Sequence, residues 1–380
     1  MASQQVNFER TLLAASGSSA ANDMGLTVFS GVVLEAFTAG SVFYDRSNSF
    51  MSIKQLNGGV SAQWPIIGKD PMSSYHTPGT FINEQSTQGT NVKRIQMYQK
   101  TITCDDYLVN ALDVPFTDLN LLHFDVLGPF ATKLGRNLAR VLDRKIAMLS
   151  FKASLEPQQV TSGDVHSGGF NVHTTGATGG AANVIYPASP QGAYNFRKDL
   201  ASLAQKFDEG NVPDGSRYLF ITPTIKTALR FETNWSSTAS AVIAANVMPS
   251  HFNADTSSDP SDVASRVIGN LEGFNIIMTN NLPAADYSTS GTTVEDGAVF
   301  SAAKYRLNTS GLTTYKQPVA VALCSADTGS PAIGMVQASG LQTYMEDDQR
   351  RNTKFMKAQL MCGLDTLCPW SAGSISVSVS

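Results

Sequence analysis

One stretch constrains the fold of this chain more than any other part of the sequence, and it runs from Leu127 to Phe151. Its apolar residues recur every three to four positions, which is the pattern of one face of an amphipathic helix. About 25 residues in a helix make a rod of roughly 37 Å, long for a compact domain. We therefore predict a spine helix over about residues 121–151. Its apolar stripe comprises Leu127, Phe130, Leu134, Leu138, Val141, Leu142, Ile146 and Leu149.

The polar side of the predicted spine helix is almost entirely positive. A charged face of this kind usually faces solvent, and that is the simplest interpretation. The alternative is that the helix packs into the core on one side and receives a neighbouring chain on the other. The basic residues are Lys133, Arg136, Arg140, Arg144, Lys145 and Lys152, with Asp143 as the one acid among them.

Composition limits the class of protein. Hydrophobic residues make up 42% of the chain and charged residues 15%, below a typical charged share of about 25%, which favours an oligomer. The net charge of −4 offers no case for a globally basic nucleic-acid-binding protein. The four scattered cysteines are inconsistent with a small disulfide scaffold. Without a signal-like start or a long apolar run, a soluble protein made in cytoplasm is expected, with no membrane partner.

The first hundred residues contain little that could form a core. Residues 1–25 are polar and small, as in an arm ordered by contact with something else. A short amphipathic helix is expected at 26–37. Within 51–100, an Asn-Gly-Gly turn at 57–59 predicts a hairpin between its flanking strands, and a further strand is expected at 91–104. A long two-stranded excursion that packs on a partner explains this composition, because an isolated hairpin is only marginally stable.

The remainder of the chain alternates between helical and strand patterns. Residues 106–122 read as a helical approach to the spine, broken at Pro115, and residues 161–180 read as a glycine-rich loop. A helix is expected at 194–210, a strand at 217–222, a helix from Pro223 and a strand at 271–283. The tail reads as strand, turn and strand over 331–346, then as a helix or strand followed by an edge strand. This order predicts an α+β fold, in which the segment 190–325 is inserted into a domain built on the spine.

No active site is visible in the sequence. The five histidines include no helical pair at four-residue spacing, and Cys362 and Cys368 are too far apart for a zinc knuckle. The segment from Gly163 to Gly169, GDVHSGG, superficially resembles the serine-protease sequence GDSGG, but two extra residues fall inside it. Phosphate-binding and dinucleotide-binding glycine patterns are missing. We therefore expect no catalytic, cofactor-binding or metal-binding residues, and no enzymatic activity.

The order of parts, together with several short motifs, resembles a known family. Each motif is weak alone, but their order and spacing together cover roughly residues 25–375. They resemble the HK97-like major capsid proteins of tailed phages, and most of all those of short-tailed phages of the T-seven group and their cyanophage relatives. The motifs are SAQWPIIGK (61–69), HTPG (76–79), NVPDGSRYLFITPTIKTAL (211–229), EGFNIIMTNNLP (272–283), GMVQASGLQTYMEDD (334–348) and KFMKAQLMCGLDTLCPWSAG (354–373).

This resemblance implies an HK97-like organisation. Residues 1–50 would be the N-terminal arm and 51–100 the extended hairpin called the E-loop. Residues 101–189 and 326–380 would form the peripheral domain around the spine helix, and 190–325 the axial domain. The implied protein assembles into hexamers and pentamers of an icosahedral shell around packaged double-stranded DNA, in the virion. Scaffolding protein and portal are implied partners during assembly in the host cytoplasm, and a decoration protein is compatible with this scheme.

The resemblance also directs attention to residues that could contact a neighbouring subunit. Apolar and basic side chains of the hairpin are candidates to bury on, or pair with, the adjacent chain, and an acidic patch near residue 346 could receive them. The basic edge of the spine is a candidate seat for a neighbour's hairpin or arm. The candidates are Lys54, Trp64, Ile66, Lys69, Phe81, Lys93, Arg94, Arg136, Arg140, Arg144, Glu346 and Asp347.

Two alternative functions remain open at the level of sequence. One is a cellular nanocompartment of the encapsulin kind, which shares the fold and differs in its cargo and genomic context. The other is a hydrolase that uses the loop at 163–173, for which Ser167 would be the nucleophile to test.

Overall fold

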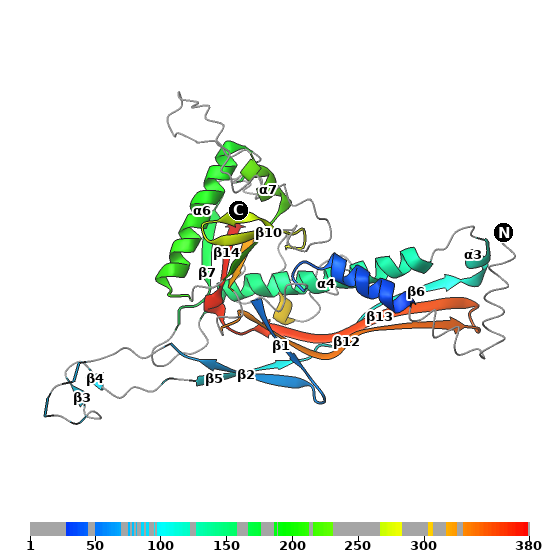
Figure 1. The fold of residues 1–380 in the computed structure, drawn as a ribbon, viewed down its shortest axis with the longest axis horizontal. Helices are drawn as coiled ribbons and strands as arrows, with labels where there is room; N and C mark the ends of the chain where they lie inside the picture. The colour runs from blue at the N-terminus through cyan, green and yellow to red at the C-terminus, as the bar shows by residue number, and fades with distance from the viewer. Residues whose placement is uncertain are drawn as a thin grey trace.

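A computed structural model of the chain describes residues 28–44, 50–69, 97–121, 127–157, 166–175, 186–187, 189–212, 216–230, 267–282, 303–306, 317–324 and 330–378, with short pieces of 70–96. Two β-sheets are joined by one long helix, and a hairpin extends from one end of the molecule (Figure 1).

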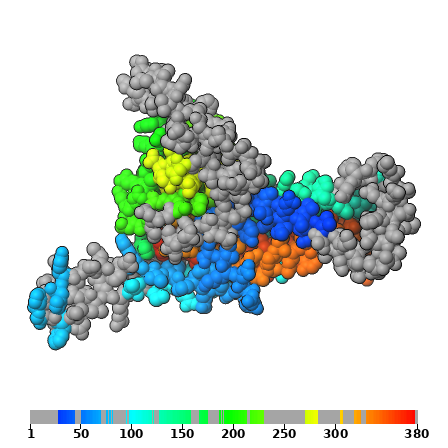
Figure 2. All heavy atoms as spheres, in the orientation of Figure 1, coloured from blue at the N-terminus to red at the C-terminus, as the bar shows by residue number. Residues whose placement is uncertain are grey.

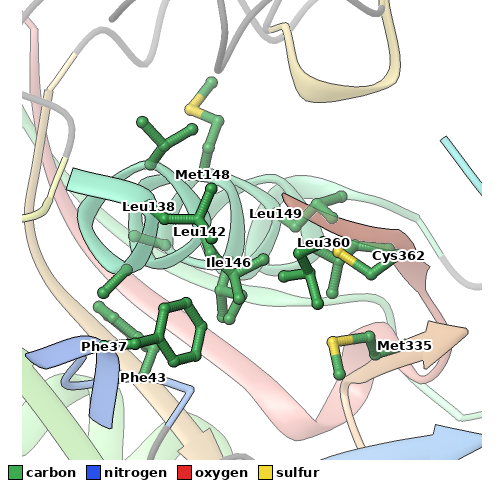
Figure 3. Close-up of a cluster of buried hydrophobic side chains, with 14 of the residues drawn as sticks. Phe37, Phe43, Leu138, Leu142, Ile146, Met148, Leu149, Met335, Leu360 and Cys362 are labelled. Atoms are coloured by element: carbon green, nitrogen blue, oxygen red, sulfur yellow. The ribbon is translucent and has the colours of Figure 1, made fainter. Parts of the chain in front are cut away.

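The predicted spine helix is confirmed as α4, which spans Leu127–Leu155, so it begins later than the expected residue 121 and ends beyond Phe151. Its 29 residues make a rod of about 43 Å. The apolar stripe points into the main core, where Leu138, Leu142 and Ile146 are buried (Figure 3). The expected charged face is corrected at two positions, because Asp143 and Lys145 are buried.

The lower sheet has the strand order β1-β12-β13-β6. It is built from β1 (Met51–Gln55), β12 (Ile333–Asp348), β13 (Thr353–Thr366) and β6 (Leu108–Pro115). β1 runs parallel to β12, and the other pairs are antiparallel. The spine helix covers one face of this sheet, and the hairpin lies on the other side (Figure 1).

Two expectations for this sheet are corrected. Residues 108–115 form the strand β6 rather than a helix, because Leu108, Leu112 and Val114 alternate with more exposed neighbours at the strand period of two. A short helix, α3 (Phe116–Leu121), follows it. Residues 333–348 form one continuous strand, and the expected turn is a register irregularity between Gln337 and Gln342.

The upper sheet has the strand order β7-β14-β11-β8-β10-β9. Its strands are β7 (Phe170–Thr175), β14 (Ala372–Ser378), β11 (Gln317–Cys324), β8 (Arg217–Ile221), β10 (Phe274–Met278) and β9 (Val267–Leu271). β7 and β14 come from outside the segment 190–325 and complete its sheet. The expectation of a final edge strand is therefore corrected, because β14 is paired on both sides. The spine helix contacts both sheets, so this lobe and the lower sheet share one core.

The helices of the upper lobe follow their sequence signals. α6 spans Pro190–Glu209, where Ser189 accepts a hydrogen bond from the N–H of Gly192 and Gly210 caps the end. α7 spans Pro223–Arg230, as its starting proline predicts. The expected strand at 271–283 is shorter than predicted, because Glu272 and Gly273 have positive φ and turn the chain between β9 and β10.

The first described helix, residues 28–40, lies along the spine helix and confirms the short amphipathic helix expected near 26–37. Its Val33 and Phe37 are buried in the main core. The close approach depends on Gly135 of the spine, where a Cβ would lie 2.5 Å from the carbonyl oxygen of Val33. A one-turn helix η2 (Ala303–Tyr305) and another, η4 (Pro369–Ser371), complete the described elements around the spine.

The hairpin consists of β2 (Ser61–Ile67) and β5 (Met97–Thr103), which pair in antiparallel fashion. The two-residue strands β3 (Gln85–Ser86) and β4 (Gly89–Thr90) lie farther out, away from the body of the molecule (Figure 2). The glycines at 58 and 59 do form a turn with positive φ, but the strands on either side do not pair. β1 joins the lower sheet and β2 joins β5, so that part of the hairpin prediction is wrong.

Candidate interaction surfaces

The base of the hairpin is fixed to its own chain by a small apolar core. Trp64 and Ile66 of β2 are 6% and 3% exposed, and they pack with Ile102 of β5. Their partners in the body of the protein are Val336, Leu367, Cys368 and Trp370. The prediction that a neighbouring subunit covers Trp64 and Ile66 is therefore wrong. Both side chains are already buried against the body of their own chain.

Lys54 also acts within its own chain. Its Nζ donates a hydrogen bond to the carbonyl oxygen of Gln63 at 2.6 Å and lies 4.5 Å from the centre of the Trp64 ring. A cation over an indole face contributes about 0.5–1 kcal/mol at exposed sites. In this conformation the lysine therefore holds β1 against β2.

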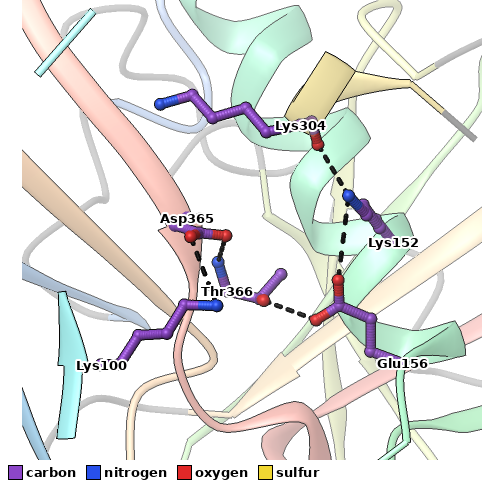
Figure 4. A network of polar contacts seen from close by, with 6 residues as sticks. All are labelled: Lys100, Lys152, Glu156, Lys304, Asp365 and Thr366. Atoms are coloured by element: carbon purple, nitrogen blue, oxygen red, sulfur yellow. Dashed lines mark hydrogen bonds and ion pairs between the residues drawn. The ribbon is translucent and has the colours of Figure 1, made fainter. Parts of the chain in front are cut away.

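The second strand of the hairpin, β5, is anchored to the body of the protein by polar contacts. Lys100 of β5 lies 3.3 Å from Asp365 at the end of β13. The next residue, Thr366, donates a hydrogen bond to Glu156 at 2.5 Å, just beyond the spine helix. Glu156 pairs in turn with Lys152, and Figure 4 shows this series of contacts. The hairpin base, the lower sheet and the end of the spine are thereby connected.

A second polar cluster surrounds Asp105, which lies between β5 of the hairpin and β6 of the lower sheet. Its carboxylate lies 2.6 Å from the Lys304 Nζ and 4.0 Å from the Lys145 Nζ. The Tyr305 hydroxyl donates to the same carboxylate at 2.6 Å. Burial lowers the pKa of Lys145, and the adjacent Asp105 acts in the opposite direction. This cluster joins the hairpin exit to the spine and to η2.

Beyond this base, the outer part of the hairpin from Ile67 to Met97, which we call the distal hairpin, exposes apolar side chains. Ile67 and Met97 face each other across the two strands and are 56% and 66% exposed. Phe81, one of the predicted contact residues, is 73% exposed. Lys69 is exposed as well, whereas Lys93 and Arg94 lie outside the described residues. Further exposed apolar side chains in this region are Tyr75, Ile95 and Tyr98.

The lower sheet has a second face, opposite the spine helix, toward the far ends of β12, β13 and β6. Tyr344 lies opposite Lys357, whose Nζ is 4.6 Å from the ring centre. The Gln359 side-chain amide donates a hydrogen bond to Gln342 Oε1 across the same strands at 3.0 Å. Exposed Val109 on β6 continues the row. This face, which we call the distal sheet face, carries a mixture of aromatic, aliphatic and amide groups.

The predicted acidic patch lies at the end of the β12–β13 ribbon. Glu346 and Asp347 are exposed. Asp347 lies 3.6 Å from the Lys354 Nζ of its own chain, a pairing that at an exposed site is worth about 0–1 kcal/mol. Among the described residues, the structure does not bring this patch together with Lys54 or Lys69 of the same chain.

The basic edge of the spine helix is present on the surface. Arg136 and Arg140 are exposed, and Arg144 is partly buried. The three follow one another at four-residue spacing, so they lie along one line of the helix. The distal hairpin, the distal sheet face and this edge are the three candidate contact surfaces.

Two histidines and two cysteines that could have served in chemistry have structural roles. The ring of His166 stacks on Trp370 at 4.3 Å, and the Nδ1 of His173 lies 3.1 Å from Ser376 Oγ within the upper sheet. Burial raises the pKa of the Cys362 and Cys368 thiols to about 12, so neither is poised as a nucleophile. No metal-binding cluster occurs among the described residues. Likewise, none of the described helices could cross a membrane.

The ion pairs of Asp105 at the hairpin base could not be predicted from local sequence patterns. Asp105, Lys145 and Lys304 are far apart in sequence, and nothing in their local pattern brings them together. One signal was available, however. Lys145 lies among the apolar positions of the spine helix, and a basic residue buried there needs an acidic partner.

The folded shape and its surfaces belong to a recognisable class. The model of the Gp10A-like major capsid protein family matches residues 63–375. The major capsid protein of Escherichia phage T7 is 26% identical over 281 residues, which cover 70% of this chain and 69% of that protein.

Solved capsids share the fold. The capsid of cyanophage P-SCSP1u has a TM-score of 0.58 at 21% identity, with 87% of each chain covered. The mature capsid of bacteriophage PhiM1 has a TM-score of 0.56 at 14% identity and covers 87% of this chain and 86% of its own. The α+β architecture is therefore the HK97-like capsid fold. The chain belongs to the Gp10A-like major capsid protein family, and it is a structural protein of the icosahedral phage virion shell.

Proposed function

We propose that subunits assemble into hexamers and pentamers of the shell through the distal hairpin, which reaches over the adjacent subunit. One observation carries this proposal: the hairpin is fixed at its base, and immediately beyond that base it exposes apolar side chains. Trp64 is buried in its own chain, whereas Ile67, only three positions further along β2, is 56% exposed. Exposed apolar groups on an anchored projection mark a protein-interaction site.

The distal sheet face is the seat proposed for that projection. The hairpin base of the same chain already covers the near part of this side of the lower sheet, around Val336 and Gly363. A neighbour's hairpin over the far part, beside Tyr344 and Gln359, would continue the same layer. Burial of apolar surface there would contribute roughly 25 cal/mol per Å².

Charged residues have a secondary role in this scheme. Lys69 of the hairpin could pair with Glu346 or Asp347 of the neighbour, and Arg140 on the spine edge could receive a neighbour's arm. Each exposed pair would contribute about 0–1 kcal/mol. The shell would therefore owe its stability to repeated apolar contacts, and the charges would set orientation.

The proposed division of the chain follows the two lobes. The lower sheet with the spine helix would be the peripheral domain, and the upper sheet with α6 and α7 the axial domain. Assembly around a scaffolding protein and a portal, followed by packaging of double-stranded DNA, fits a shell subunit of this class. We propose no catalytic role and no cofactor.

Shortening the hairpin tests the proposal. Residues 69–95 are replaced by Asn-Gly, which suits a two-residue turn between β2 and β5 and leaves the Trp64 core in place. The variant is expected to keep the circular dichroism spectrum and urea midpoint of the wild type but to form no regular shells with scaffold, as judged by negative-stain microscopy. Normal shells from the shortened protein would refute the bracing role of the hairpin.

A further inference from the structure

Asp143 is an acid buried at the meeting point of three parts of the molecule. It lies on the inner side of the spine helix and is 0% exposed. One oxygen accepts a hydrogen bond from the backbone N–H of Val42 at 2.5 Å, and the other accepts from the N–H of Tyr44 at 3.1 Å. The amide of Asn281, just beyond β10, donates to it at 3.2 Å.

The segment held by Asp143 connects the N-terminal helix to the rest of the protein. Residues 41–44 follow the helix over 28–40, and Phe43 stacks on Phe220 of β8 at a centroid distance of 4.1 Å. The carboxylate therefore joins this segment to the spine, while Phe43 and Asn281 join the same place to the upper lobe. Changes in the Asp143 contacts would alter how these three parts are connected.

Among the described residues, no counter-ion contributes to the pKa of Asp143 besides burial and its hydrogen bonds. Its hydrogen-bond donors are the backbone N–H groups of residues 42–44 and the Asn281 amide. Of the cations near it along the helix, Arg140 is exposed, Arg144 is partly exposed, and Lys145 lies 4.0 Å from Asp105. Tyr44 is the titratable residue of the 41–44 segment, and burial raises the pKa of its phenol. Asp143 is therefore the group in this junction that can titrate near neutral pH.

We propose that Asp143 and residues 42–44 form a proton-sensitive latch, which holds the N-terminal helix, the spine and the upper lobe together more tightly at mildly acidic pH than at neutral pH. Without a counter-ion, the hydrogen bonds offset only part of the cost of burying the charge. Opening the junction would return the carboxylate to water and remove that cost. The latch is a property of the single chain and does not depend on shell formation.

The direction of the effect follows from the protonation equilibrium. Burial raises the pKa of Asp143 to about 6, against an ordinary value of 3.8. The closed form therefore binds the proton more tightly than the open form, and its added stability is lost as the pH rises through about 6. For these two pKa values, the equilibrium constant for opening should increase about tenfold between pH 5 and pH 7.5.

Hydrogen exchange measured by mass spectrometry on the purified, unassembled full chain tests the latch. Peptides that contain residues 41–44 are compared at pH 5 to 7.5, after correction for the intrinsic exchange rate. The wild type should show the tenfold rise in opening, and Asp143→Asn should show none, because its side chain cannot titrate. Asp365→Asn is the matched control, which removes an acid elsewhere and should retain the rise.

A second variant keeps the test decisive if Asp143→Asn does not fold. Asn281→Ala removes a hydrogen bond that favours the charged form, so the midpoint of the pH-dependent opening should move to higher pH. The proposal is overturned if the wild type shows no rise, if Asp143→Asn retains it, or if Asn281→Ala leaves the midpoint unchanged. The measurement uses unassembled protein, so a failure of the assembly model would not alter its result.

Discussion

The indole Nε1 of Trp64 donates a hydrogen bond to Ser52 Oγ at 2.9 Å, and this bond joins β2 of the hairpin to β1 of the lower sheet. Ser52 and Trp64 lie on either side of the glycine turn at 58–59, so the turn connects two different sheets. The bond orients the indole within the small core at the hairpin base. The direction in which the hairpin leaves the molecule is thus set inside a single chain.

Truncation of Trp64 should therefore destabilise the isolated subunit. Trp64→Ala removes a large buried side chain and its hydrogen bond, and replacements of this kind cost about 3–5 kcal/mol. Urea unfolding followed by tryptophan fluorescence and circular dichroism gives the loss. Tyr75→Ala is the control, since the Tyr75 side chain is 92% exposed and its loss should leave unfolding unchanged. Equal stability of Trp64→Ala and the wild type would argue against the proposed hairpin core.

The exposed end of the hairpin should affect assembly without affecting folding. The double variant Ile67→Ser/Met97→Ser removes two facing apolar side chains from the outer surface of the hairpin. Its urea midpoint should match that of the wild type, while its yield of shells with scaffold should fall severalfold in sucrose-gradient sedimentation. Val60→Ser, which changes an exposed apolar residue near the hairpin base, is the matched control. A normal yield from the double variant would mean that these side chains do not contact a neighbour.

Two helical glycines should respond in opposite ways to alanine. A Cβ at Gly31 meets nothing within 4 Å among the described residues, so Gly31→Ala should stabilise the protein by about 0.5–1 kcal/mol. At Gly135 a Cβ would collide with the Val33 carbonyl, which is backbone. Gly135→Ala should therefore lower the unfolding midpoint by displacing the 28–40 helix. Thermal unfolding of both variants measures the two effects. If both substitutions stabilise the protein, the close contact between Gly135 and the 28–40 helix is contradicted.

Loss of the Asp105 carboxylate should leave the buried Lys145 without its acidic partner. Breaking a buried pair by removing one member typically costs about 3–5 kcal/mol of stability. Because Asp105 is partly exposed, we expect Asp105→Asn to lower the free energy of unfolding by about 2 kcal/mol. Asp347→Asn is the control, because its pair with Lys354 is at the surface. Chemical unfolding at pH 7 should separate the two variants, and equal midpoints would show that the Asp105 cluster is not stabilising.

Charge reversal on the spine edge tests the proposed seat there. Arg140→Glu changes an exposed residue, so the free energy of unfolding should change by less than about 1 kcal/mol. Shell yield should nevertheless fall, because a seat for a neighbour's arm would become repulsive. Lys226→Glu on α7 serves as a charge-matched control. Normal assembly of Arg140→Glu would count against this edge as a contact.

Much of the fold could be predicted from local sequence patterns. The apolar period of the spine, the proline at the start of α7 and the glycine after α6 each act through nearby residues, and the helices appear where these signals place them. Non-local pairing was harder to predict. Nothing near residue 51 indicates that β1 pairs with β12, some 280 residues later, rather than with β2.

The candidate contact residues show the same limit. The local sequence around Trp64 does not distinguish a tryptophan buried in its own chain from one that contacts a neighbour. The distinction comes from Val336 and Trp370, which are distant in sequence and pack around Trp64. The sequence places Asp143 on the polar face because it is charged, whereas its buried position depends on contacts with residues 42–44. Patterns along one helix cannot reveal what another segment brings to it.

The mass of the particle formed in solution tests the central claim most directly. The full chain is expressed with its scaffolding protein, and the product is analysed by sedimentation velocity and mass photometry. The account predicts closed particles of one size in the megadalton range, formed by the wild type and lost when residues 69–95 are replaced by Asn-Gly. A folded protein that remains monomeric under these conditions, or a shortened variant that assembles normally, would contradict it.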